Sequence, residues 1–260
     1  MSNYLSSLFA VAGRRAIVTG ASGALGAQFA RSLARAGADV VLAARRIAPM
    51  EALRDELIAG GVRAHVVALD LERASSVEAA FDKAQDWASA PIDIVINNSG
   101  IAAPSALLDQ ADQDWDNVMT VNLNGARLVA NAAVRRLIEA GEKGSIINVA
   151  SILGLRQGAG VAAYATSKAA LIQLTKQQAL EWARHGIRVN ALAPGYIETD
   201  INRDYFSTDA GTSLIKRIPM RRLGQSSELD GALLYLASDA GSFVTGAVQI
   251  VDGGHLLSTL

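Results

Sequence analysis

Residues 16–26 read AIVTGASGALG, a short apolar run followed by three glycines, Gly20, Gly23 and Gly26. Directly after them the sequence takes on the spacing of an amphipathic helix. Glycines between a strand and a helix let the main chain approach a pyrophosphate closely, and the N-terminus of the helix adds partial positive charge. The stretch predicts a dinucleotide-binding turn, which also contains Ser22, Ala24 and Leu25. A plain strand-to-helix turn is the alternative.

The rest of the chain alternates short β-branched runs with longer stretches of helical spacing. We predict strands near residues 14–19, 39–43, 63–69, 92–97, 144–150, 187–192 and 247–251. Helices are predicted near residues 24–36, 50–60, 74–89, 112–140, 161–185 and 226–237. Most of the strands are apolar throughout, as in a parallel sheet that is covered on both faces. The pattern predicts an α/β fold, a Rossmann-like, doubly wound, seven-stranded parallel sheet in a three-layer α/β/α arrangement.

Residues 198–224 interrupt this rhythm. The segment is polar, carries charges of both signs and contains Pro219 and Gly224. Long excursions in compact domains often cover a binding site, so we predict one or two short helices that form a substrate lid. With no linker and no repeat elsewhere, residues 1–260 are expected to form a single domain.

Bulk composition excludes several kinds of function. Lys and Arg number 24 against 25 Asp and Glu, so no nucleic-acid partner is expected. The chain has no cysteine, and its three histidines lack ligand spacing, so we expect neither a disulfide nor a metal site. No apolar run has the length of a transmembrane helix, and the N-terminus resembles a packed arm more than a signal peptide. We expect a soluble, cytoplasmic protein with no membrane contact.

The carboxyl end of the second predicted strand bears on which dinucleotide binds. An acid there would hold the ribose diol of NAD, but the nearby acid, Asp39, lies at the opposite end of that strand. Arg45 and Arg46 stand where the acid would be, and arginine binds a 2′-phosphate well. NADP(H) is therefore favoured, and NAD(H) remains possible if the two arginines are only solvated surface charge.

Polar residues also follow the third and fourth predicted strands. Asp70 and Leu71 end the third, where the adenine of a dinucleotide would lie, and Asn98, Ser99 and Gly100 follow the fourth. In a doubly wound sheet these ends meet in one crevice. The alternative is that these side chains merely cap the helices that follow.

The strongest chemical signal lies in residues 151–168. Tyr164 and Lys168 are four residues apart, so a helix places both on one face, and Ser151 precedes them just beyond the fifth predicted strand. A phenol can give a proton to a developing alkoxide, and a nearby ammonium would lower its pKa, since a unit charge at about 4 Å is worth about 4 kcal/mol. Ser151 has no evident His–Asp pair, so a hydrolase is disfavoured. A Tyr and Lys that merely share a helix face are the alternative.

Together these motifs resemble the short-chain dehydrogenase/reductase family over nearly the whole chain. The matching stretches are TGASGALG, Asp70-Leu71, NNSG, VNLNG, Ser151, Tyr164-x-x-x-Lys168, RVNALAPG and VDGG. The sequence departs from the usual T-G-x-x-x-G-x-G pattern because Ala24 takes the place of the middle glycine. It also has no basic residue at Gly23, which leaves the NADP prediction to Arg45.

The resemblance implies residue roles. Tyr164 would be the general acid/base, Ser151 would orient the substrate, and Lys168 would hold the nicotinamide ribose. Asn122 would complete a catalytic tetrad by kinking its helix and fixing a water that relays protons to Lys168. The nicotinamide side would be held by Pro194, Gly195, Ile197 and Thr199. Together with Ser151 and Tyr164, the substrate pocket would contain Ile152, Leu153, Tyr196, Tyr205 and Phe206.

The expected activity is hydride transfer between NADP(H) and a carbonyl or secondary alcohol of a small molecule. Two alternatives stay open: a dinucleotide-binding regulator or structural subunit without turnover, and a redox-neutral dehydratase or epimerase. The family also implies a homotetramer, or a homodimer, assembled through the helices near residues 112–140 and 161–185.

Overall fold

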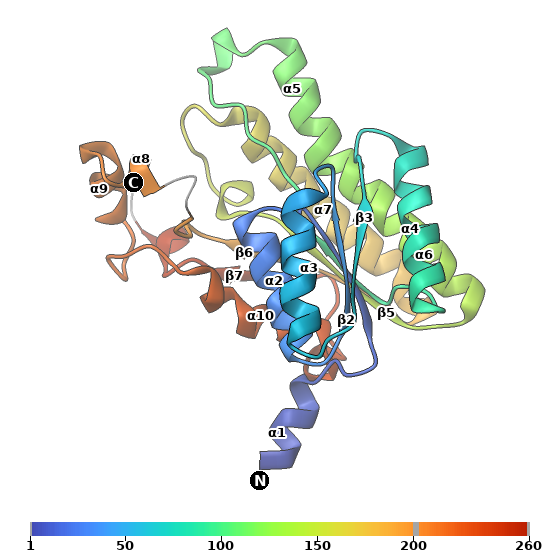
Figure 1. The fold of residues 1–260 in the computed structure, drawn as a ribbon. Helices are drawn as coiled ribbons and strands as arrows, with labels where there is room; N and C mark the ends of the chain where they lie inside the picture. The colour runs from blue at the N-terminus through green and yellow to red at the C-terminus, as the bar shows by residue number, and fades with distance from the viewer. Residues whose placement is uncertain (1, 200–202, 259–260) are drawn as a thin grey trace.

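One parallel sheet organises the protein (Figure 1). The computed structural model describes residues 2–199 and 203–258, and in that part of the chain the strand order is β3-β2-β1-β4-β5-β6-β7. The strands are β1 (Arg15–Thr19), β2 (Asp39–Ala44), β3 (Ala64–Ala68), β4 (Ile94–Asn97), β5 (Gly144–Val149), β6 (Ile187–Pro194) and β7 (Val248–Val251). This sheet confirms the predicted fold class.

Helices cover both faces of the sheet (Figure 1). On one side, α2 (Ala24–Arg35), α3 (Ala48–Ala59) and α10 (Asp230–Ala237) bury Phe29, Met50 and Leu233 in one hydrophobic cluster. On the other side, α4 (Ala74–Ala88), α6 (Ala126–Ala140) and α7 (Ala162–Trp182) bury Phe81 and Leu137 in a second cluster. The central strands are apolar because each of their faces contributes to a core.

The chain changes direction at β1, which creates the site. β1 pairs with β2 on one side and with β4 on the other, as the partners of Ile17 show: Val41 in β2 and Val95 in β4. The connections after β1 and β4 therefore diverge to opposite faces. At such a switch point a crevice opens beyond the carboxyl ends of the strands.

The helix predicted for residues 112–140 is present over this range but is not α-helical throughout. It consists of α5 (Asp112–Met119), a π-helical turn η2 (Thr120–Gly125) and α6. The sequence TVNLNG contains β-branched residues and asparagines, which are weak α-formers, and Gly125 packs so tightly that an added Cβ would lie 2.7 Å from Leu71 Cβ. Such π-turns occur frequently at functional sites.

Two shorter helices form the excursion after β6. α8 (Arg203–Phe206) and α9 (Asp209–Ile215) agree with the predicted short helices of residues 198–224, of which residues 200–202 lie outside the described residues. The base of the excursion is tied to itself, because Glu198 N–H donates to Gly224 O at 2.8 Å and Gly224 N–H to Tyr196 O at 3.0 Å. The segment is thus anchored at both ends.

The N-terminal arm forms a helix, α1 (Ser2–Phe9), that projects from the end of the molecule opposite α5 (Figure 1). Tyr4 on this helix is exposed, so the arm packs less than the sequence suggested. No helix in the described part of the chain is long and apolar enough to cross a bilayer.

Candidate active site

A cavity of about 600 Å³ opens at the switch point, beyond the carboxyl ends of β1, β2 and β4. It brings together most of the residues predicted to hold a dinucleotide: Gly20, Ser22, Gly23, Ala24, Leu25, Gly26, Arg45, Arg46, Asp70, Leu71, Asn98, Ser99, Gly100 and Thr199. Residues that the prediction did not include also line it: Ala44, Leu69, Glu72, Ile101 and Val121.

The glycine turn fits a dinucleotide. Gly20 has a φ of 66°, a conformation that favours glycine, and a Cβ on Gly26 would lie 2.3 Å from Gly20 O. Gly26 thus lets α2 start directly against the strand end, with its first N–H groups facing the cavity. Gly23 is different, because a Cβ there would meet only Gly20 O at 3.5 Å, so this position tolerates a side chain.

Thr19 braces the turn from behind, a role that the sequence analysis missed. Its Oγ1 accepts the main-chain N–H of Asn98 and of Ser99, each at 3.1 Å, and it donates to Ile96 O. The Asn98 side chain donates in turn to Thr19 O at 3.0 Å. These bonds fix the loop after β4 against the glycine turn, so Asn98 acts here as a brace of the cavity wall.

Two arginines and an acid share the rim of the cavity where β2 ends. Arg45 and Arg46 are exposed, and Arg45 Nη1 lies 3.6 Å from Glu72 Oε1. Nearby, Asp70 accepts Arg73 Nε at 2.8 Å and the N–H of Glu72 at 3.2 Å. Asp70 therefore orders the turn before α4 without capping that helix, and it also lines the cavity. Glu72 was missed, although it directly follows the Asp70-Leu71 motif.

Ser151 and Tyr164 meet beyond the end of β5. Ser151 begins the turn η3 (Ile152–Gly154), and its Oγ accepts the N–H of Leu153 at 3.1 Å. Tyr164 lies in the first turn of α7 and is half-buried. Burial raises the pKa of the Tyr164 phenol, and a hydrogen bond with Ser151 lowers it in part. The two hydroxyls are thus held next to each other.

Lys168 lies one turn further along α7 and is buried, 3% exposed. Its Nζ donates to Val149 O at 2.8 Å and lies 5.6 Å from the centroid of the Tyr164 ring. Burial lowers the pKa of Lys168 from 10.5 to about 8. A buried ammonium thus stands on the same helix face as the phenol, as the spacing predicted.

The expected lowering of the Tyr164 pKa by Lys168 is wrong for the free protein. Burial is the largest influence on the phenol and raises its pKa, and Tyr196 raises it further. Removal from water disfavours both the phenolate and the ammonium. The Tyr164 phenol is therefore protonated near neutral pH.

Asn122 lies in the π-turn, fully buried. Its Oδ1 accepts the N–H of Ile101 at 2.8 Å, and its Nδ2 donates to Ile101 O at 2.9 Å and to Ser167 Oγ at 3.0 Å. Asn122 thus ties the cavity loop to α7. A Cβ on Gly100 would lie 3.4 Å from Asn122 Oδ1 and 3.3 Å from Lys168 Nζ, so these two groups border the same small space.

The predicted substrate residues lie around this edge. Ile152 and Leu153 form the turn after Ser151. Tyr196 contacts the rings of Phe206 and His255, with centroids 5.7 and 5.3 Å apart, and Tyr205 contacts Phe206 at 5.2 Å. His255 is only 5% exposed and belongs to this aromatic cluster.

The segment after β6 leads from the sheet into the excursion. Pro194 ends β6, and Gly195 passes so close to β7 that a Cβ would lie 2.7 Å from Asp252 Cα. Thr199 reaches the large cavity, whereas Ile197 lines a second cavity of about 170 Å³ on the β7 side. The four predicted residues therefore lie in one short segment but do not share one pocket.

Comparisons with known proteins agree with this geometry. A family model described as "Enoyl-(Acyl carrier protein) reductase" matches residues 20–255. Gluconate 5-dehydrogenase of Gluconobacter oxydans is 39% identical over 254 residues, covering 96% of this chain and 98% of the relative. The 3-oxoacyl-(acyl-carrier-protein) reductase of Pseudomonas aeruginosa is 37% identical over 246 residues, covering 95% and 98%.

A solved structure is similar over the whole fold. It is a gluconate 5-dehydrogenase from Burkholderia cenocepacia J2315 in complex with NADP and tartrate, with a TM-score of 0.93, 38% identity and coverage of 98% of this chain and 100% of that one. The NADP in that structure agrees with the preference predicted from Arg45. The chain belongs to the short-chain dehydrogenase/reductase family and is an oxidoreductase that moves a hydride between a nicotinamide and a CH–OH carbon.

Proposed function

We propose that this protein is an NADP(H)-dependent dehydrogenase/reductase that interconverts a secondary alcohol and a ketone on a polyhydroxylated carbon chain. The observation that carries the proposal is the convergence of Ser151, Tyr164 and Lys168 beyond the end of β5, bordered by Asn122 and next to the dinucleotide cavity. The similarity to gluconate 5-dehydrogenases supports the substrate class.

Tyr164 moves the proton. In the reducing direction its phenol donates to the oxygen of the substrate, which gains negative charge as the carbonyl carbon is reduced. The raised pKa of Tyr164 keeps this phenol protonated near neutral pH, which suits reduction. Oxidation of the alcohol needs the phenolate to accept the hydroxyl proton, so its rate should rise with pH.

Ser151 and Lys168 support that transfer. The Ser151 hydroxyl, fixed at the start of η3, hydrogen-bonds the substrate oxygen and aligns it with Tyr164. The Lys168 ammonium would stabilise the negative charge of a Tyr164 phenolate, and within the described residues it donates to Val149 O alone, which leaves donors for a ribose hydroxyl. Asn122 holds the loop and α7 at a fixed distance through Ile101 and Ser167.

The cavity residues hold the cofactor. The glycine turn and the first turn of α2 would bind the pyrophosphate, Asp70 and Leu71 would flank the adenine, and Arg45 would bind the 2′-phosphate. When bound, the nicotinamide donates or accepts the hydride, which is the only redox chemistry that the reaction requires.

The excursion covers the substrate side as a lid. Tyr205 and Phe206 lie on α8, and their ring contacts with each other and with Tyr196 bring the lid next to the catalytic edge.

We also expect the chain, as a single domain, to self-associate, because α7 exposes Leu180 and the region before β7 exposes Phe243, both large apolar side chains. A cytoplasmic location stays a prediction.

A substrate panel tests the proposal. Oxidation of gluconate is measured with NADP, and reduction of 5-ketogluconate and of a 3-oxoacyl thioester is measured with NADPH. Nicotinamide absorbance follows each reaction, and each is repeated with NAD(H). Turnover of the hydroxy or keto acid with NADP(H) is expected. Preference for the thioester would overturn the substrate class, and conversion without an absorbance change would indicate the redox-neutral alternative.

A further inference from the structure

Arg156 is an arginine of the substrate side that the mechanism above does not use. It closes the turn that Ser151 begins, because its N–H donates to Ile152 O at 2.9 Å. Its side chain is half-buried, and Nη1 donates to His255 O at 2.6 Å and to Ser258 Oγ at 3.3 Å. No carboxylate pairs with Arg156 among the residues that the structure describes.

The donors of Arg156 are only partly used. A guanidinium has five N–H donors, and within residues 2–199 and 203–258 the hydrogen bonds of this side chain run through Nη1 alone. Nε and Nη2 therefore keep their donors for a ligand. The planar fork of these donors matches the two oxygens of a carboxylate.

The neighbours of Arg156 belong to the substrate side. His255, whose carbonyl Arg156 holds, places its ring 5.3 Å from that of Tyr196. The Nδ1 atom of His255 is buried and has no partner within the described part of the chain. An aromatic wall, a buried polar atom without a partner and a guanidinium thus stand together, one short turn away from Ser151.

The charge around this group favours an anion. Asp252 is the nearby acid, but its two oxygens already accept the N–H groups of Gly254, at 2.8 Å, and of Leu256, at 2.6 Å. Arg217 adds a second positive charge: burial is the main cause of the lowered pKa of His255, and Arg156 and Arg217 lower that pKa further against the opposing charge of Asp252. The arrangement leaves a net positive potential beside the Tyr196 phenol.

We propose that Arg156, seated against His255, binds the carboxylate of the substrate and so selects hydroxy and keto acids over uncharged polyols. This inference rests on the proposed function and adds the acidic group and its anchor. Ser151 and Tyr164 would engage the reacting carbon at one end of the substrate, and Arg156 would hold the other end. The polyhydroxylated chain between them would lie along the Tyr196–Phe206 wall.

The alternative role of Arg156 is a clamp that only holds the C-terminal segment through His255 and Ser258. The two roles differ in what they discriminate. A carboxylate anchor affects the binding of acids alone, whereas a clamp affects all substrates and the stability of the fold equally.

The test compares Arg156→Met with the wild type, using gluconate and the uncharged polyol galactitol as substrates. Loss of a charge-assisted pair should raise KM for gluconate about 30-fold and leave galactitol kinetics within about 2-fold. Arg156→Lys should recover part of the loss. Arg184→Met, which removes an exposed cation far from the site, is the matched control and should match the wild type.

Equal losses for both substrates, or no loss for gluconate, would overturn the proposal. Tartrate binding by calorimetry, with the NADP-loaded protein, separates this result from a failure of the proposed function. If no substrate in the panel is turned over but tartrate binds the wild type at least about 10-fold tighter than Arg156→Met, the carboxylate anchor stands. Equal tartrate affinity of the two proteins would contradict the role of Arg156 as a carboxylate anchor.

Discussion

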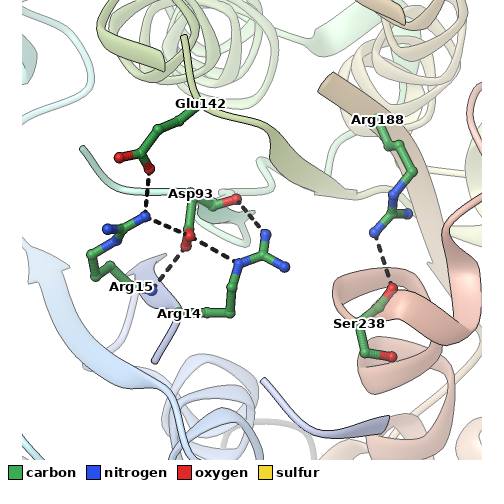
Figure 2. Close-up of polar contacts among 6 residues, drawn as sticks. All are labelled: Arg14, Arg15, Asp93, Glu142, Arg188 and Ser238. Atoms are coloured by element: carbon green, nitrogen blue, oxygen red, sulfur yellow. Dashed lines mark hydrogen bonds and ion pairs between the residues drawn. The ribbon is translucent and has the colours of Figure 1, made fainter. Parts of the chain in front are cut away.

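The charged side chains at the two ends of the sheet differ in how far protein groups occupy their donors and acceptors. At the amino end, Asp93 accepts Arg14 Nε at 2.8 Å, Arg15 Nη2 at 2.7 Å and the N–H of Arg15 at 2.8 Å, and Arg15 also pairs with Glu142 (Figure 2). Arg188 beside them donates to main-chain carbonyls, that of Ser238 included (Figure 2). The charges at this end are engaged within the protein.

At the carboxyl end, the cationic side chains keep N–H donors that no group in the described part of the chain accepts. Lys168 is buried and donates to one protein acceptor, Val149 O, in the described part of the chain. Arg156 uses only one of its nitrogens there, and Arg45 has only a loose contact with Glu72. The ion pairs of Asp93 join Arg14 and Arg15 to the end of the sheet, whereas cations with unused donors remain available to ligands and can cost stability. We infer that the charges at the amino end serve the fold and that the cations at the carboxyl end serve ligand binding.

Lys168→Met should disable the cation at the carboxyl end of the sheet and lower activity strongly. We expect kcat to fall about 100-fold or more, because charge stabilisation at the phenol is lost. Stability should change in the opposite sense. A lysine pKa lowered from 10.5 to about 8 means that holding Lys168 as a cation costs about 3 kcal/mol at neutral pH, less the bond to Val149 O.

The pH dependence of stability follows from the same shift. Between pH 8 and 10.5 the unfolded chain binds more protons at Lys168 than the folded chain does, so the burial cost is fully present below pH 8 and fades as the pH rises. Urea unfolding should show this upward contribution in the wild type and not in Lys168→Met. An identical pH profile in both proteins would contradict it.

Asp93→Asn should destabilise the fold at the amino end of the sheet and leave catalysis unchanged. Arg14 would lose its acid and Arg15 would keep its pair with Glu142, so we expect the free energy of unfolding to fall by about 2–4 kcal/mol, while kcat and KM stay within about 2-fold. Urea unfolding and steady-state kinetics at a temperature where the variant is folded measure both. A large kinetic change in folded protein would show that the two ends are not independent.

Arg45→Ser should have the smallest of these effects, on cofactor choice. Loss of the cation that faces the 2′-phosphate should lower the preference for NADPH over NADH, as the ratio of kcat/KM, about 10-fold. Glu72→Gln is the matched variant of opposite sign, because it frees Arg45 from an acid 3.6 Å away and should raise that ratio about 2-fold. No change in Arg45→Ser would move the selectivity to Arg46.

Much of the fold was predictable because strands and helices leave local patterns. β-branched runs located the strands to within a few residues, and the four-residue spacing of Tyr164 and Lys168 placed both on one helix face. The π-turn at Thr120–Gly125 was not predicted, since weak α-propensity does not by itself specify a π-turn and the packing of Gly125 against Leu71 joins residues far apart in the sequence.

The sequence predicted only those site residues that belong to local sequence motifs. Arg156 and His255 stand 99 residues apart, so neither their contact nor the unpartnered Nδ1 had a local signal. The Tyr164 pKa was predicted in the wrong direction because spacing shows which charge is near but not how far a group is removed from water.

Tyr164→Phe tests the central claim most directly. The substitution removes one hydroxyl and keeps the ring, so the cavity and the Lys168 contact with Val149 should persist. We expect kcat with the substrate identified for the wild type to fall about 10³-fold, while the Kd for NADPH, measured by nicotinamide fluorescence, stays within about 3-fold. A variant that binds NADPH and keeps most of the wild-type turnover would contradict the assignment of Tyr164 as the group that moves the proton.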